Sequence, residues 1–86
     1  MNHKDQITRM NRIAGQVAGI TRMIEDERYC MDILLQLRAV RAALKKVEGN
    51  ILLKHMQHCV AEAMGEDPAA QEKVMELQRF FEAERD

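Results

Sequence analysis

Hydrophobic residues recur at intervals of three and four positions along the first part of the chain. This spacing lines one side of an α-helix, so it predicts a helix from about residue 5 to residue 25. Gly15 and Gly19 lie four positions apart beside this row, and each weakens a helix by roughly 1 kcal/mol relative to alanine. We therefore interpret them as marking a close approach by another helix. The row consists of Ile7, Met10, Ile13, Val17, Ile20 and Ile24.

A second and more regular row of hydrophobic residues follows the acidic run at 25–27. Its intervals alternate between four and three, as they do in a coiled coil. The row keeps its phase across Gly49 and Asn50, which could otherwise end a helix. We therefore predict one long helix from near Cys30 to about Met64. The members of this row, called the seam below, are Ile33, Leu37, Val40, Leu44, Val47 and Ile51.

A stop signal and a start signal separate the long helix from a third one. Gly65 is a natural helix end, and Asp67 followed by Pro68 is typical of a helix start. The third helix should carry Val74, Leu77, Phe80 and Phe81 as its apolar residues. Alternation typical of strands is almost lacking, so the sequence predicts an all-α protomer of three helices, with residues 1–86 as a single domain.

The length of the chain makes self-association attractive. A protein of 86 residues buries only about 60 to 65% of its unfolded surface, and two cysteines are too few for a disulfide scaffold. The sequence opens with no secretion signal and contains no apolar run long enough to span a membrane, so we expect a cytoplasmic protein. Thiols stay reduced in that compartment, which favours metal binding or reactivity for Cys30 and Cys59.

The charge is divided unevenly between the two halves of the chain. Residues 1–46 contain nine basic and five acidic residues, whereas residues 47–86 contain four basic and nine acidic ones. The first half therefore carries a net charge of +4 and the second half −5. A basic half suits a polyanion such as DNA, although solvated helix surfaces without any partner give the same pattern.

Three residues with metal-binding side chains continue the seam at both of its ends. His55 and Cys59 are one helical turn apart, a spacing at which two side chains can hold one metal ion. Cys30 lies 25 residues earlier, about 37 Å away along a straight helix. Two antiparallel copies of the helix would bring Cys30 of one beside His55 and Cys59 of the other, crossing near residue 44 among several alanines. A histidine and a thiol packed in an ordinary core remain the alternative for the His55 and Cys59 pair.

Two thiolates and one imidazole form a soft donor set. Such a set favours Cu(I) or Zn(II), and zinc would need a fourth ligand such as water, His3 or His58. His58 fits either the helix interface or solvent. A thiol activated by His55 would also need an oxyanion hole and a pocket, which nothing in the sequence supplies, so we do not expect an enzyme. A metal carrier that binds no DNA is the competing interpretation.

The sequence resembles the copper-sensitive operon repressors, the CsoR/RcnR group of metal-sensing regulators. The resemblance rests on Asn11-Arg12-Ile13-Ala14-Gly15-Gln16-Val17, on Tyr29-Cys30, and on His55-x-x-x-Cys59, and it extends over nearly the whole chain. It implies an antiparallel homodimer that forms a four-helix bundle, and a homotetramer built as a dimer of dimers. It also implies a Cu(I) site between subunits formed by Cys30, His55 and Cys59. Tyr29 and Glu76 would be outer residues, which lie next to the ligands but do not bind the metal.

The same resemblance implies a repressor that binds operator DNA without metal and releases it on binding Cu(I). By position, Arg9 and Lys46 match basic residues implicated in DNA binding, and Arg12 and Arg41 are companions on charge alone. Relatives with other donor sets respond to formaldehyde, persulfide or nickel. Cys59 argues against the first and His55 against the second, whereas a Ni(II) sensor using His3 and a Zn(II) sensor stay open.

Overall fold

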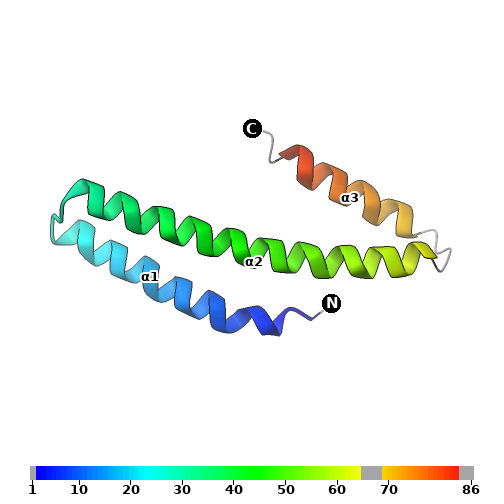
Figure 1. The fold of residues 1–86 in the computed structure, drawn as a ribbon, viewed down its shortest axis with the longest axis horizontal. Coiled ribbons are helices and arrows are strands. Elements are labelled where there is room, and N and C mark those ends of the chain that lie inside the picture. The colour runs from blue at the N-terminus through cyan, green and yellow to red at the C-terminus, as the bar shows by residue number, and fades with distance from the viewer. Residues whose placement is uncertain (1, 65–68, 84–86) are drawn as a thin grey trace. The chain divides into compact units, whose positions relative to one another are not determined.

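The computed structural model describes the backbone of residues 2–64 and 69–83, and their side chains except those of 60–64, 69–71 and 74. Within these ranges the chain is helical, with a short 3-10 helix η1 (Lys4–Gln6), then α1 (Ile7–Glu25), α2 (Cys30–Met64) and α3 (Ala69–Ala83) (Figure 1). The prediction of an all-α chain with three main helices is confirmed. The predicted stop and start signals at Gly65, Asp67 and Pro68 lie outside the described residues.

Helix α2 continues through Gly49 and Asn50 for a total of 35 residues, as the unbroken phase of the seam predicts. By contrast, the first helix begins differently from the prediction. Its opening turn is a 3-10 turn, because the Gln6 N–H donates to the carbonyl oxygen of His3, three residues back, at 3.0 Å.

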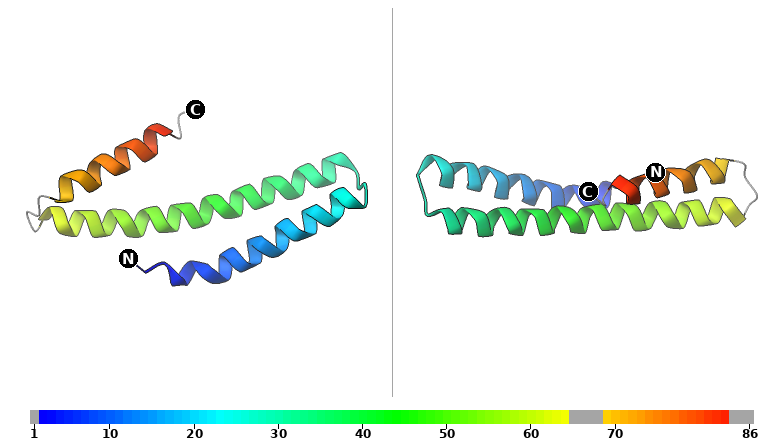
Figure 2. Two further views of the ribbon diagram at one scale, coloured as in Figure 1. Left: turned by 180° about the vertical axis from the view of Figure 1, so that it is seen from behind. Right: turned by 90° about the horizontal axis from the view of Figure 1, so that it is seen from above.

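The chain forms two compact units, Met1–Ile51 and Leu52–Asp86. In the first, α1 runs antiparallel beside the first part of α2 (Figures 1 and 2). Its buried core consists of Ile13 and Ile20 from α1 and Val40 and Val47 from α2, and Ile33, Ala43 and Ile51 pack against this core. In the second unit, Phe80 and Phe81 of α3 meet edge to face with their ring centroids 5.8 Å apart.

Each hydrophobic row is divided between the inside of the helix pair and its surface. Ile13 and Ile20 are buried, whereas the other apolar residues of the α1 row are exposed. On α2, Val40 and Val47 are buried, whereas Leu37 and Leu44 are each 41% exposed. Two helices in contact need only one narrow line of side chains from each, so the remaining apolar surface is left over.

The two glycines of α1 do not make the predicted close approach inside this protomer. A Cβ added at Gly15 would meet nothing within 4 Å, and one at Gly19 would meet only the Arg22 side chain at 3.9 Å. The cost of these glycines to the helix is therefore not offset by packing within the described part of the chain.

The connection between α1 and α2 is a tight helix ending. The Arg28 N–H donates to the Met23 carbonyl at 3.0 Å, and the Glu27 N–H donates to the Ile24 carbonyl at 3.1 Å. Glu27 takes a positive φ of 54°, the left-handed conformation that this ending requires and that glycine usually supplies. The turn reverses the chain within four residues.

Helix α2 starts directly after this turn. The Tyr29 carbonyl accepts from the N–H groups of Asp32 and Ile33 at 3.0 and 3.2 Å, which makes Cys30 the first residue of α2. None of the described helices is long and apolar enough to cross a membrane.

Candidate functional site

His55 and Cys59 lie together on α2 in the second unit. The Nε2 atom of His55 is 3.6 Å from the Sγ atom of Cys59, because residues four apart stack one turn above the other on a helix. Cys59 is only 3% exposed, and His55 is half-buried. The prediction that these two side chains share one face is confirmed.

The distance between these two atoms suits a shared metal ion. In zinc sites the metal lies about 2.3 Å from sulfur and about 2.0 Å from nitrogen, so bond angles of roughly 110 to 120° separate the two donors by about 3.5 to 3.8 Å. The observed 3.6 Å falls inside this range. Sulfur and imidazole nitrogen are also donors that Cu(I) prefers. The spacing of the two donor atoms is therefore compatible with one shared metal ion.

Cys30 is exposed at the first position of α2. Among the described residues, no group of three or more His, Cys, Asp or Glu side chains is placed to hold one metal ion. The three predicted ligands are therefore not assembled within the described part of one chain. This agrees with the 25-residue separation, which already required a second copy of the helix to bring Cys30 to the other two.

The remaining candidates for the metal centre are spread along the chain. Tyr29 directly precedes α2 and is 69% exposed, and Glu76 is exposed on α3. His3 precedes η1, and its Nδ1 atom is buried with no hydrogen-bond partner among the described residues. His58 is exposed on α2. Their roles at the metal centre stay predictions.

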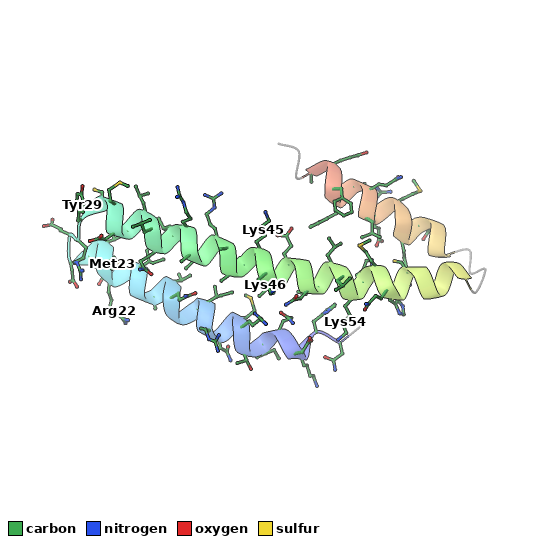
Figure 3. The ribbon with its side chains drawn as sticks, in the orientation of Figure 1. Arg22, Met23, Tyr29, Lys45, Lys46 and Lys54 are labelled. Carbon is green, nitrogen blue, oxygen red and sulfur yellow. The ribbon has the colours of Figure 1, made fainter. Side chains whose placement is uncertain are left out.

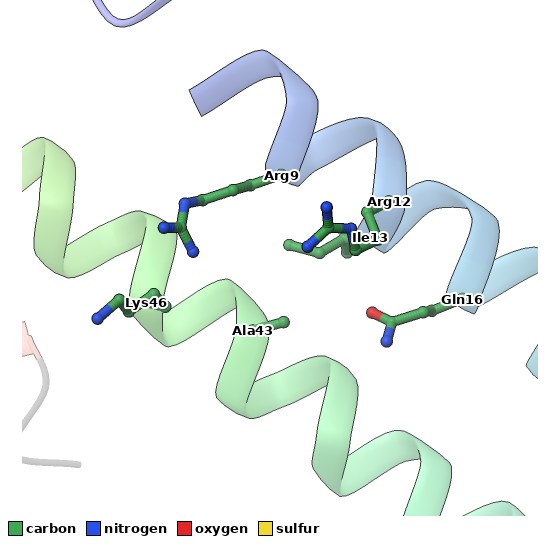
Figure 4. A pocket seen from close by; sticks show the side chains of 6 residues that line it. All are labelled: Arg9, Arg12, Ile13, Gln16, Ala43 and Lys46. Carbon is green, nitrogen blue, oxygen red and sulfur yellow. The ribbon is translucent and has the colours of Figure 1, made fainter. Parts of the chain in front are cut away.

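A second candidate site is a pocket of about 260 Å³ between α1 and α2 in the first unit. Arg9, Arg12 and Gln16 reach into it from α1, and Lys46 borders it on α2 (Figure 4). Its apolar base is formed by Ile13 and Ala43. The structure therefore brings together three of the four basic residues predicted to bind DNA.

Charge in this pocket is entirely positive. None of the six residues that line it is acidic, and its three cationic side chains are all exposed to solvent. Arg41 does not belong to the lining, since five residues at about 100° each turn it roughly 140° away from Lys46 around α2. Its role in DNA binding stays a prediction. Lys45 likewise lies outside the pocket, on the side of α2 away from α1 (Figure 3).

Gln16 lines the pocket although it was not among the predicted site residues. Arg9, Arg12 and Gln16 follow one another at intervals of three and four, so they share one stripe of α1. This spacing was visible in the sequence and marks Gln16 as part of the same surface. Its side-chain amide adds a neutral hydrogen-bond donor to the three cations.

A hydrogen bond next to this pocket joins η1 to α2. The Asn50 side-chain amide on α2 donates from Nδ2 to Gln6 Oε1 at 3.1 Å. The Gln6 amide in turn donates from Nε2 to Asp5 Oδ2 at 3.1 Å. Gln6 is only 8% exposed, so this hydrogen bonding satisfies a buried polar side chain.

Comparison with known proteins gives matches over almost the whole chain. A family model described as metal-sensitive transcriptional repressor matches residues 2–83. The copper-sensing transcriptional repressor CsoR of Bacillus subtilis is 53% identical over 70 residues, covering 74% of this chain and 69% of that protein. The copper-sensing transcriptional repressor RicR of Mycobacterium tuberculosis is 48% identical over 69 residues, covering 79% of this chain and 72% of that protein.

Two solved structures have the same fold. The copper-sensing repressor CsoR with Cu(I) from Geobacillus thermodenitrificans is 36% identical with a TM-score of 0.87, covering 100% of this chain and 92% of that one. The nickel-responsive transcriptional regulator InrS is 30% identical with a TM-score of 0.81, covering 96% of this chain and 92% of that one.

Proposed function

Because the chain belongs to the family of metal-sensitive transcriptional repressors, we propose that it binds operator DNA in its metal-free form and releases it on binding Cu(I). Relatives at 53% and 48% identity are named copper-sensing repressors, and a solved relative at 36% identity holds Cu(I). The observation that carries the proposal is the pairing of His55 Nε2 with Cys59 Sγ at 3.6 Å. A repressor of this kind acts in the cytoplasm.

The metal centre forms between two copies of the chain. Each copy supplies His55 and Cys59 as a preformed pair, and the second copy supplies Cys30. The two thiolates are soft donors and the imidazole is a donor that copper also accepts, so the set of three suits Cu(I). Tyr29 and Glu76 are the proposed outer residues. Tyr29 directly precedes Cys30, so its hydroxyl would reach the site together with the Cys30 thiol.

Leftover apolar surface on α2 supports this assembly. Cys30, Leu37 and Leu44 follow at intervals of seven, so they form one row on the helix, and the two leucines are exposed. A second antiparallel copy would cover the row and carry Cys30 to the partner's metal-binding pair. We propose an antiparallel homodimer, with the exposed apolar residues of α1 available for a homotetramer.

The pocket between α1 and α2 is the proposed seat for the DNA backbone. Arg9, Arg12 and Lys46 present three positive charges around this opening, and no carboxylate is among the six described residues that line it. Phosphate oxygens accept hydrogen bonds from such groups, and the contacts fix a protein on the duplex without reading its sequence. Arg41 remains a proposed contact from another face of α2.

A titration tests the function directly. A duplex enriched from a random DNA pool by the metal-free protein should be released when Cu(I) is added under anaerobic conditions. Zn(II) should release it weakly or not at all. A stronger effect of Ni(II) than of Cu(I) would favour a nickel sensor, for which the buried unpartnered Nδ1 of His3 offers an additional ligand. Recovery of no enriched duplex would favour a metal carrier.

Two lysine substitutions distinguish DNA binding at the pocket from an effect of net surface charge. We expect Lys46→Ala to weaken binding of the enriched duplex about tenfold and to lower the salt dependence by about one phosphate contact. Lys45→Ala is the matched control, because it removes the same charge from the side of α2 away from α1 (Figure 3). Fluorescence anisotropy at several salt concentrations measures both. Equal losses in the two variants would show that only net charge matters.

A further inference from the structure

We infer that Gln6 and Asn50 form a clamp that positions Arg9 opposite Lys46 for binding a DNA phosphate. The inference rests on the proposed function of the pocket and adds two positioning residues to it. Neither residue lines the pocket itself. The observation that carries the inference is the hydrogen bond from Asn50 Nδ2 to Gln6 Oε1 at 3.1 Å, which joins residues 44 positions apart.

The clamp replaces an apolar contact at the open end of the helix pair. Gln6, Ile13 and Ile20 follow at intervals of seven, and all three are buried against α2. An apolar side chain at position 6 would continue the core. A polar residue in such a row weakens packing but fixes the alignment of the two helices, because only one alignment satisfies its hydrogen bonds.

The clamp lies one helical turn from both basic residues that it would position. Arg9 on α1 follows Gln6, the last residue of η1, by three residues, and Lys46 precedes Asn50 by four residues on α2. Sliding α1 by one turn would move Arg9 by about 5.4 Å relative to Lys46. The alignment fixed by Gln6 and Asn50 therefore sets the distance between the two cations.

The pocket needs such a restraint because its charges repel one another. Arg9, Arg12 and Lys46 surround one opening, and none of the residues that line it carries a compensating negative charge. The covalent connection at 26–29 holds the opposite end of the helix pair, whereas Arg9 lies near the free end of α1. Helix ends open more readily than helix centres, so loss of the clamp would release Arg9 first.

A double-mutant cycle tests the clamp. Asn50→Ala removes the donor and keeps α2 intact, because alanine favours helix. We expect Asn50→Ala and Arg9→Ala each to weaken binding of the enriched duplex about tenfold and to lower the salt dependence by about one contact. The two changes together should cost little more than either alone, since the clamp acts through Arg9. The affinity for Cu(I) should stay unchanged.

Two further variants distinguish positioning from general stability. Gly49→Ala, next to the clamp, meets no atom within 4 Å and should raise thermal stability without changing DNA affinity. Exchanging the two side chains, Gln6→Asn with Asn50→Gln, keeps the amide pair and its combined length. The exchanged protein should bind the enriched duplex with at least half the affinity of the unaltered protein, as measured by anisotropy.

The possible failures are distinct. Additive losses in the cycle, or full affinity in Asn50→Ala while Arg9→Ala binds weakly, would overturn the clamp and leave the proposed interface standing. Full affinity in both Arg9→Ala and Lys46→Ala would instead overturn the interface. If Asn50→Ala and the exchanged pair lost thermal stability and DNA affinity to the same extent, general destabilisation would explain the weaker binding. That result would also count against the clamp.

Discussion

Replacing either Cys30 or Cys59 with alanine should abolish release of DNA by Cu(I) while leaving the metal-free protein bound to its duplex. Each variant loses one of three ligands, so we expect the affinity for Cu(I) to fall by more than about a hundredfold, beyond the effect typical of a lost outer residue. Cys30 is exposed in the single chain, so its loss should hardly change the stability of the protomer. Cys59 is 3% exposed, so its truncation should lower the free energy of unfolding by about 1 kcal/mol.

Competition with a Cu(I) chelator, followed by anisotropy of the labelled duplex with and without copper, measures this prediction. Cys59→Ser is the control for packing, because serine nearly preserves the volume while removing the soft donor. Full release of DNA by Cu(I) in either alanine variant would show that the replaced thiol is not a ligand.

The same two variants test whether the metal centre is shared between chains. A mixed dimer of one Cys30→Ala chain and one Cys59→Ala chain should contain one complete site and one site that lacks both thiols. It should therefore bind one Cu(I) ion with the affinity of the unaltered protein. If all three ligands came from a single chain, every site in the mixed dimer would lack one thiol and none would bind tightly.

The sequence predicted the elements of this fold better than their packing. The intervals of three and four placed α1 and α2 within a few residues of their observed bounds, because periodicity is a local property of the chain. The same intervals could not say which half of each row lies inside the protomer. Leu37 belongs to the seam as firmly as Val40 does, yet only Val40 is buried. That division depends on which neighbouring helix covers each residue.

The candidate sites show the same limit. His55 and Cys59 could be paired from the sequence, since four residues make one turn of any helix. The hydrogen bond between Gln6 and Asn50 could not, because it depends on how far α1 has slid along α2. Gln6 did leave a signal, as a polar residue seven positions before Ile13 in a row that is otherwise apolar. Its hydrogen bond to Asn50 could be identified only from the structure.

Substituting His55 should separate metal binding from release of DNA. His55 presents Nε2 to Cys59 Sγ, which leaves Nδ1 on the other side of the ring to hydrogen-bond an outer residue. Such a bond orients the imidazole ring, and a movement of the ring on metal binding would shift the outer residue bonded to it. Glu76 and Tyr29 of the second copy are the proposed outer residues. A link of this kind can make Cu(I) bind more tightly to the DNA-free form than to the DNA-bound form, and a switch needs that difference in free energy.

The size of that difference sets the expected result. Coupling between two binding sites is ordinarily about 1 to 3 kcal/mol, and moving a population from 1% to 99% needs roughly 5.5 kcal/mol. If His55 carries most of the coupling, His55→Ala should still bind Cu(I) through Cys30 and Cys59, because a two-coordinate thiolate site suits this ion. The affinity for the duplex should then change less than about threefold on adding copper.

Anaerobic Cu(I) titration and duplex anisotropy on the same sample measure both quantities. His58→Ala is the matched control, since it removes an exposed imidazole from the same helix three residues away and should leave the switch intact. A His55→Ala protein that binds copper and still releases its duplex fully would show that the two thiolates drive the switch alone. In that case the change in shape would begin at one or both thiols, at Cys59 on α2 or at Cys30, which directly follows the turn in which Glu27 has a positive φ.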